Sequence, residues 1–162
     1  LYVKQKVFAI KDRFSIYDEN QDVIFTCEGK LFSIGKKLNV FDSNNQNAAY
    51  IHQKVLSILP KYFINRNGLD IACVHRKLTF FRPSYDIAEL NWHVQGNFLA
   101  HEYTITQNGN MIISVSKKWL SWGDCYELNI ADNVDLVNAI CVVLIIDADL
   151  FSERASVSVS SD

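Results

Sequence analysis

Hydrophobic and polar residues alternate along most of this chain, and the alternation returns at a nearly constant interval. Six anchor positions, Lys6, Lys30, Lys54, Lys77, Asn97 and Lys118, are spaced by 24, 24, 23, 20 and 21 residues. A polar residue stands two positions before each anchor. An apolar residue stands three positions before it. Because successive side chains of a β-strand point to opposite faces, this pattern predicts one half-buried strand in each repeat. The apolar residues are Val3, Cys27, Ile51, Val74, Val94 and Val115.

A second strand is predicted in each repeat. It opens with an aromatic residue or a leucine, 8 residues after the anchor in five repeats and 6 residues after it in the repeat of Asn97. Another apolar residue follows two positions later. Turn sequences such as Asn67-Gly68 and Asn108-Gly109 come next, and Asn-Gly is typical of tight β-hairpins. The opening residues and their followers are Phe14 and Ile16, Leu38 and Val40, Tyr62 and Ile64, Tyr85 and Ile87, Tyr103 and Ile105, and Tyr126 and Leu128.

One segment near the C-terminus departs from this alternation. Its centre, Ala139–Ile146, is apolar without a polar face, which is typical of a buried helix or a buried strand. Six hairpins favour the helix. Their sheet exposes long edges unless it closes, and so wide a barrel is not filled by its own side chains. We therefore expect an all-β fold, a closed barrel of about twelve antiparallel strands around a central hydrophobic helix at about 134–151, with Asp132 and Asn133 as N-cap candidates.

The length of 162 residues fits one domain of this kind. We expect the barrel domain to span residues 1–151 and the Ser-rich stretch 152–162 to be a disordered tail. No signal peptide or transmembrane segment is apparent, and the four cysteines form no CxxC pair. We therefore expect a cytoplasmic protein with reduced thiols. The alternative is a secreted protein with disulfides.

Charge is distributed unevenly along the chain. Residues 1–82 contain thirteen Lys and Arg against seven Asp and Glu, a net charge of +6, whereas residues 83–162 contain three against eleven, a net charge of −8. The total of −2 gives no overall basic character, so no nucleic-acid partner is expected. The uneven distribution instead indicates that an anion-binding site should be sought in the basic first half.

The main candidate site is a basic cluster in the first three repeats. Since the residue that opens each second strand is expected to face inward, the residue before it should face outward on three neighbouring hairpins. A row of cations at one rim could hold a phosphorylated headgroup or another anion. The alternative is a solvated rim that only keeps the strand ends soluble. The candidate residues are Lys11, Arg13, Lys36, Lys37 and Lys61, of which Arg13, Lys37 and Lys61 directly precede the opening residue.

Other chemistry-bearing residues are explained more simply. Anchor lysines such as Lys54 are expected to lay their stems over apolar surface and keep their ammonium groups in water. His52 and His75 occupy equivalent outward positions, but no third ligand stands at a fitting spacing, so no metal site is expected. His101 and Glu102 lack an accompanying nucleophile or oxyanion element. We therefore expect no catalytic residue, no cofactor and no enzymatic activity.

Several of these features resemble the LURP-one-related family, in particular its bacterial branch. They are the Tyr-x-Ile pattern of the second strands, the segments Ser116–Asp124 and Tyr126–Ile130, and the closing apolar helix. The resemblance extends from Leu1 to about Phe151. It implies a tubby C-terminal-like fold, a twelve-stranded barrel with a central hydrophobic helix that is shared with phospholipid scramblases. Tubby domains bind phosphoinositide headgroups, but their headgroup motif is not matched position by position in this chain, so the resemblance assigns no site residue.

The expected function is that of a non-catalytic binding domain. It would recognise an anionic or phospholipid headgroup ligand through the basic rim, in peripheral contact with a membrane. The alternative is a structural or protein-interaction domain that uses its basic and acidic halves and takes no small-molecule ligand. The sequence does not indicate an oligomeric state.

Overall fold

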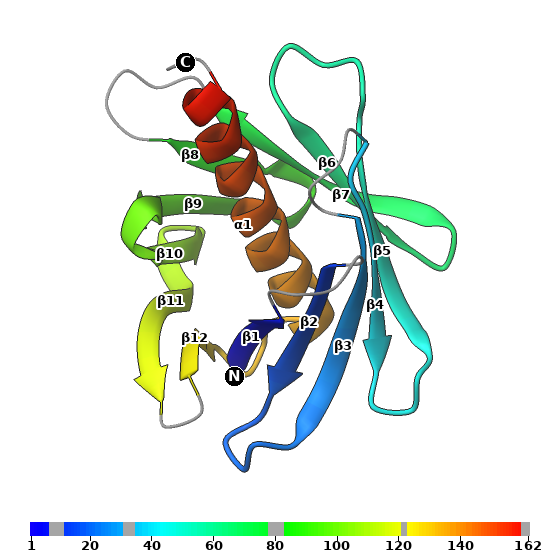
Figure 1. Cartoon of the computed structure of the whole chain (residues 1–162), viewed down its shortest axis with the longest axis vertical. Coiled ribbons are helices and arrows are strands. Elements are labelled where there is room, and N and C mark those ends of the chain that lie inside the picture. Colours follow the sequence, from blue (N-terminus) through cyan, green and yellow to red (C-terminus); the bar gives the residue numbers. More distant parts are fainter. Residues whose placement is uncertain (7–11, 31–34, 78–82, 121–122, 160–162) are drawn as a thin grey trace.

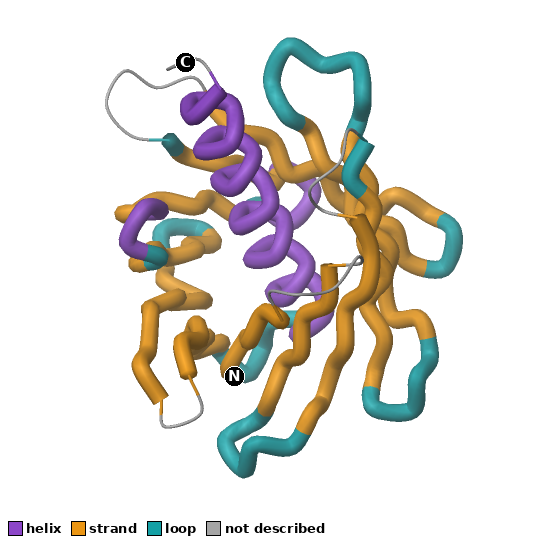
Figure 2. Tube along the Cα trace, viewed as in Figure 1, coloured by secondary structure: helices purple, strands orange, loops and turns teal. Residues whose placement is uncertain are grey.

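One antiparallel sheet curves around one C-terminal helix in the computed structural model of this chain (Figure 1). The structure describes residues 1–6, 12–30, 35–77, 83–120 and 123–159. Figure 2 shows the helix running through the space that the strands surround. The prediction of an all-β antiparallel sheet with a C-terminal helix is confirmed for the described residues.

Each sequence repeat supplies two neighbouring strands, as the hydrophobic pattern predicts. The strands are β1 (Tyr2–Lys6), β2 (Asp12–Tyr17), β3 (Val23–Lys30), β4 (Lys37–Asp42), β5 (Asn47–Gln53), β6 (Lys61–Arg66), β7 (Leu69–Lys77), β8 (Ser84–Ile87), β9 (Trp92–Asn97), β10 (Glu102–Gln107), β11 (Asn110–Leu120) and β12 (Gly123–Ile130). Short 3₁₀ turns at Ala88–Leu90 and Phe98–Ala100 join β8 to β9 and β9 to β10.

Neighbours in the chain are also neighbours in the sheet. From β2 to β12 each strand pairs with the one that follows it in sequence. Strand β1 pairs with β2 and also with β12, where Tyr2 lies opposite Glu127 and Val3 opposite Tyr126. At this junction the amide of Leu128 donates a 2.7 Å hydrogen bond to the carbonyl of Leu1. The first and last strands are therefore joined by main-chain contacts.

The predicted division into inner and outer faces is present wherever the side chains are described. Tyr126 is half-buried beside His101. The other predicted inward residues are buried, as expected for a pleat that turns every second side chain to the core. They are Phe14, Ile16, Cys27, Leu38, Val40, Ile51, Tyr62, Ile64, Val74, Tyr85, Ile87, Val94, Tyr103, Ile105, Val115 and Leu128.

Two hairpin turns have the backbone that their sequences predict. Asn67 and Gly68 have φ of 52° and 82°, and Asn108 and Gly109 have φ of 52° and 79°. Positive φ at both central residues is the signature of a type I′ turn, whose twist matches that of the flanking strands. These two Asn-Gly pairs therefore set the register of β6 with β7 and of β10 with β11.

The helix α1 spans Leu136–Val159, two residues later at its start and eight residues later at its end than expected. Its N-cap is Asp135, because the carboxylate of Asp135 accepts a 2.8 Å hydrogen bond from the amide of Asn138. The expectation of Asp132 and Asn133 as caps is therefore wrong. The cap lies at the last carboxylate before the apolar run, within reach of the free amides of the first turn.

The Ser-rich stretch is helical through Val159, contrary to the expectation of a disordered tail for that part. The residues 152–155 are Ser, Glu, Arg and Ala, and no Gly or Pro stands there to end the helix. Residues 160–162 lie outside the described part of the chain.

The centre of the helix forms the core of the molecule. Every side chain of Ala139–Ile146 is at most 2% exposed. Burying one Val, Leu or Ile side chain contributes about 1.5–3 kcal/mol, so this segment is a major source of stability. All four cysteines are free thiols. Burial raises the pKa of Cys141 to about 12, and burial followed by the proximity of Cys141 raises the pKa of Cys27.

Candidate functional site

The five residues of the predicted basic cluster do not share one environment. Lys37 and Lys61 are the first residues of β4 and β6, and both are exposed. Arg13 is exposed on β2, but its guanidinium forms an ion pair with the carboxylate of Glu28 on β3. Lys36 is buried, and Lys11 lies outside the described residues.

A third exposed lysine joins Lys37 and Lys61. The amide of Lys54, just after β5, donates a 2.9 Å hydrogen bond to the carbonyl of Lys61. Strand β5 lies between β4 and β6, and Lys37 lies opposite His52, two residues before Lys54, so Lys37 and Lys61 are about 12 Å apart on a diagonal across the sheet. Within the described ranges, no Asp or Glu forms an ion pair with any of the three. We call these three residues the lysine rim.

Lys54 was not among the predicted site residues. Its place in the sequence repeat explained it as an anchor that covers apolar surface. Five of the six residues that follow it, Val55–Pro60, are apolar or proline, against four of six after Lys6 and after Lys77. Two other anchors form ion pairs, Lys77 with Asp86 and Lys118 with Glu127.

The segment between Lys54 and Lys61 is an exposed apolar loop, which we call the apolar loop (55–60). The exposed fractions are 57% for Val55, 94% for Leu56 and 102% for Ile58. In Figure 1 this loop projects from the upper end of the sheet between β5 and β6. A Cβ placed on Gly35 would lie 3.2 Å from Val55 Cγ2, so the loop rests against the residue before Lys36.

Lys36 points into the molecule, and its assignment to an anion-binding rim is wrong. Its side chain is 4% exposed, and its ammonium donates to the carbonyl of Ala148 at 2.5 Å. The same ammonium lies 3.4 Å from the hydroxyl of Tyr62. The physical reason is the period of two, since Lys36 stands on the same face as Leu38 and Val40.

The hydroxyl of Tyr62, which the ammonium of Lys36 approaches, also contacts Asp149, a buried carboxylate of the helix. Asp149 is 2% exposed, and it accepts hydrogen bonds from Tyr85 at 2.8 Å and from Tyr62 at 3.4 Å. Arg76 approaches it to 3.9 Å. Burial, followed by the charge of Asp149, raises the pKa of Tyr62 well above its ordinary value. Arg76 and the two tyrosines thus compensate this buried carboxylate, and Lys36 is linked to it through the hydroxyl of Tyr62.

His101 contacts a second acid of the helix. Its Nδ1 lies 3.8 Å from Asp147, and its ring stacks on Tyr126 with 4.4 Å between centroids. Tyr103 is buried nearby, and burial followed by the charge of Asp147 raises its pKa. His101 is therefore part of the packing between the sheet and the helix.

The outer histidine His52 is also engaged by its neighbours. Its ring stacks between Tyr50 and Phe63, and its Nε2 lies 3.1 Å from Asp70. A hydrogen bond from Asn65, followed by that from His52, lowers the pKa of Asp70. In the described part of the chain no group of three or more His, Cys, Asp or Glu could hold a metal ion.

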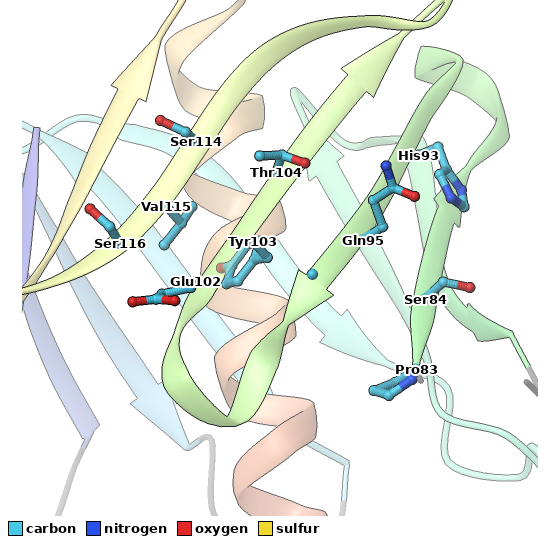
Figure 3. A pocket seen from close by; sticks show the side chains of 11 residues that line it. Pro83, Ser84, His93, Gln95, Glu102, Tyr103, Thr104, Ser114, Val115 and Ser116 are labelled. Atoms are coloured by element: carbon cyan, nitrogen blue, oxygen red, sulfur yellow. The ribbon is translucent and has the colours of Figure 1, made fainter. Parts of the chain in front are cut away.

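A groove of about 710 Å³ lies on the outer face of β8 to β11 (Figure 3). Strand β9 contributes Gly96, which has no side chain, and β10 contributes the exposed carboxylate of Glu102. His93 stands at one side, with its Nδ1 2.6 Å from Asp86. Hydroxyl groups line much of the rest, which suits hydrogen bonding but supplies no positive charge for an anion. They belong to Ser84, Thr104, Ser114 and Ser116.

Over the residues that the structure describes, no helix combines the length and the apolar character that a membrane span requires.

Comparisons with known proteins agree with the architecture. The family model of the LURP-one-related proteins matches residues 1–147. The uncharacterized protein YxjI of Bacillus subtilis is 39% identical over 154 residues, which cover 95% of each chain. The X-ray structure of an Arabidopsis thaliana protein, AT5G01750, is similar with a TM-score of 0.62 at 15% identity, covering 90% of each chain. With its hairpin repeats, its buried C-terminal helix and a match over almost its whole length, the chain belongs to the LURP-one-related family.

Proposed function

We propose that this chain is a non-catalytic binding domain for anionic surfaces, with phospholipid headgroups as its ligands. The observation that carries the proposal is the lysine rim, in which Lys37, Lys54 and Lys61 are exposed at the ends of three adjacent strands. Their positive charges are not matched by an ion-paired carboxylate in the described part of the chain.

The magnitude of the interaction follows from the number of cations. A lysine close to an anionic membrane surface contributes about 1 kcal/mol, so three give about 3 kcal/mol, or about a hundredfold in affinity. Arg13 and Lys36 are left out of this sum. Glu28 neutralises Arg13, and the ammonium of Lys36 is bound to the helix.

The side-chain chemistry supports binding of headgroups as a class. A lysine ammonium is a compact point charge on a flexible stem, and it lacks the planar fork with which arginine selects one geometry of phosphate. Three such groups on neighbouring strands suit a surface of many anionic headgroups. They supply no nucleophile or proton relay, so the proposal includes no reaction.

The test is co-sedimentation with lipid vesicles. The protein should bind vesicles that contain about 30% phosphatidylserine and not vesicles of phosphatidylcholine alone, and binding should weaken as salt screens the charges. The variant Lys37→Gln with Lys61→Gln should lose about thirtyfold in affinity, since two lysines contribute about 2 kcal/mol. The matched control, Lys117→Gln with Lys118→Gln, removes two exposed charges from β11 and should bind like the parent.

Equal loss in both variants would show that only overall charge matters and would contradict the lysine rim. If the parent protein binds no vesicles even at low salt, the function itself is wrong. In that case a mass in solution that rises with concentration would favour the protein-interaction alternative.

We also propose that the sheet is closed into a barrel of about twelve strands in solution. The pairing of β1 with both β2 and β12 supports this closure. Hydrogen exchange tests it, because the amide of Leu128, bonded to the carbonyl of Leu1, should be protected like amides of central strands. Rapid exchange at Leu128 would indicate an open sheet.

A cytoplasmic and membrane-peripheral location completes the proposal. Four free thiols, three of them buried, support a reducing compartment. A fluorescent fusion should distribute between the cytoplasm and the inner face of the membrane, and Lys37→Gln with Lys61→Gln should shift it to the cytoplasm.

A further inference from the structure

The apolar loop differs from four hairpin turns in the described part of the chain. Turns at residues 18–22, 43–46, 67–68 and 108–109 consist of Asp, Glu, Asn, Gln, Ser and Gly residues. The loop between β5 and β6 instead exposes Val55, Leu56 and Ile58. These three are half of the large hydrophobic side chains exposed in the described ranges, and the others, Val23, Leu69 and Met111, are scattered. Such a concentration is typical of a surface that takes part in an interaction.

The two ends of the loop are held together and are basic. Lys54 and Lys61 are joined by the 2.9 Å hydrogen bond between their main chains, and Lys37 stands beside them on β4. Cations therefore lie at the base and apolar side chains at the tip. This order matches an anionic bilayer, where headgroup charge lies outside and apolar acyl chains begin about 5–10 Å deeper.

We propose that the apolar loop inserts into the boundary between the headgroups and the acyl chains of an anionic bilayer. Leu56 and Ile58 enter the apolar region while the lysine rim stays at the headgroups. The inference rests on the proposed function and adds to it the partner, which is an intact bilayer and not a free anionic headgroup.

Charge decides between a bilayer and a second copy of the chain as the occupant. Two copies that met through their apolar loops would bring two lysine rims together, and like charges in close contact oppose association. An anionic bilayer offers an apolar phase and complementary charge at once. Pro60, with its fixed φ, and the contact of Val55 with Gly35 restrict the loop before binding, which reduces the entropy lost on insertion.

The first experiment removes the apolar tip and keeps the charges. The variant Leu56→Ser with Ile58→Ser should lose about tenfold or more in affinity for vesicles with phosphatidylserine, since two apolar side chains no longer leave water. Val23→Ser with Leu69→Ser is the matched control, because it changes two other exposed apolar residues and should bind like the parent. Equal thermal unfolding of the variants and the parent shows that the fold is intact.

The second experiment reports the position of the loop directly. In a Cys73→Ser background, Leu56→Cys carries an environment-sensitive fluorophore, and Met111→Cys carries it as the control. Adding vesicles should shift the emission of the Leu56→Cys conjugate to the blue, and nitroxide lipids should quench it. The Met111→Cys conjugate should remain as in water.

The outcomes separate this inference from the proposed function. Insertion is wrong if the parent binds vesicles in a salt-sensitive way, the fluorophore on Leu56→Cys stays exposed to water and Leu56→Ser with Ile58→Ser binds fully. In that case the lysine rim still accounts for the binding. Absence of vesicle binding by the parent overturns both. A blue shift that needs no vesicles and grows with protein concentration would show that the apolar loop binds a second copy of the chain and not a bilayer.

Discussion

The ammonium of Lys36 donates a 2.5 Å hydrogen bond to the carbonyl of Ala148, a residue 112 positions later in the chain. This contact joins the start of β4 to the interior of the helix, one residue before the buried carboxylate of Asp149. The neighbouring residue, Lys37, points to solvent. Two adjacent lysines thus serve separate purposes, one for stability and the other for the proposed binding surface.

Replacing Lys36 should therefore affect stability and leave membrane binding unchanged. We expect Lys36→Met to lower the free energy of unfolding by about 2–4 kcal/mol, because a buried hydrogen bond is lost and Asp149 keeps less positive charge near it. Urea denaturation measures the change. Lys37→Met is the control and should change stability by less than about 0.5 kcal/mol. A stable Lys36→Met protein with weakened vesicle binding would place Lys36 in the rim after all.

A charge in the centre of the helix should prevent folding. Val143 is 2% exposed among apolar neighbours, and an unpaired buried carboxylate costs several kcal/mol against a total stability of about 5–15 kcal/mol. We expect Val143→Asp to be insoluble or to lack a cooperative thermal transition, with Val143→Ile as the conservative control. A Val143→Asp protein that unfolds cooperatively would contradict a buried helix.

The N-cap should make part of the stability depend on pH. Burial raises the pKa of Asp135, but hydrogen bonds from Arg66 and from the amides of Asn138 and Val137 outweigh burial, so the folded pKa is lowered. Asp135 therefore stabilises the fold at pH values above the unfolded pKa of about 3.9, and the contribution is lost as pH falls through the folded pKa.

Two substitutions separate the charge of Asp135 from its role as a cap. Asp135→Ala should cost about 1 kcal/mol at pH 7, because the cap is lost. Asp135→Asn keeps a cap oxygen, and its difference from the parent protein should shrink as pH falls below about 4. Urea denaturation from pH 3 to pH 7 checks both. A constant difference between Asp135→Asn and the parent over this range would contradict the charge effect.

Gly96 in β9 should tolerate no side chain. A Cβ at this position would lie 2.5 Å from the Cα of Tyr103, with a φ of +151°. We expect Gly96→Ala to lower the melting temperature by several degrees, equivalent to about 2 kcal/mol or more. Gly68→Ala, where φ is +82° and no atom lies within 4 Å, is the control for positive φ alone and should cost about 1 kcal/mol. Equal losses in the two variants would exclude the clash with Tyr103 as the cause.

Much of the fold could be predicted because strand patterning is local. Phe14, Leu38 and Tyr62 were predicted to face inward from a period of two residues, and the pleat alone enforces that direction. The turns at Asn67-Gly68 and Asn108-Gly109 could be predicted for the same reason, since Asn and Gly adopt positive φ readily whatever the rest of the chain does. The helix ends were not predicted correctly, because Asp132, Asn133 and Asp135 are all suitable caps in sequence. Only the observed hydrogen bond to Asn138 distinguishes Asp135.

The candidate site was predicted only in part. The pattern identified Lys37 and Lys61 as exposed cations, but it grouped them with Lys36 and Arg13. The burial of Lys36 could have been predicted, because it stands two residues before Leu38 on the inward face. The neutralisation of Arg13 by Glu28 could not, since it depends on the register of β2 with β3. The exposure of Leu56 and Ile58 could not be predicted either, because apolar residues in a sequence pattern are expected in the core.

The sequence by itself determined the hairpin repeat, the inward and outward faces of each strand and an apolar C-terminal segment that had to be buried. These properties arise from interactions within a few residues and from the need to remove apolar surface from water. The tertiary structure alone decided which polar groups each buried charge meets: Lys36 meets Ala148 and Tyr62, and Asp149 meets Tyr85. Such partners lie up to 112 residues apart, and only the packing of the helix against the sheet brings them within hydrogen-bonding distance.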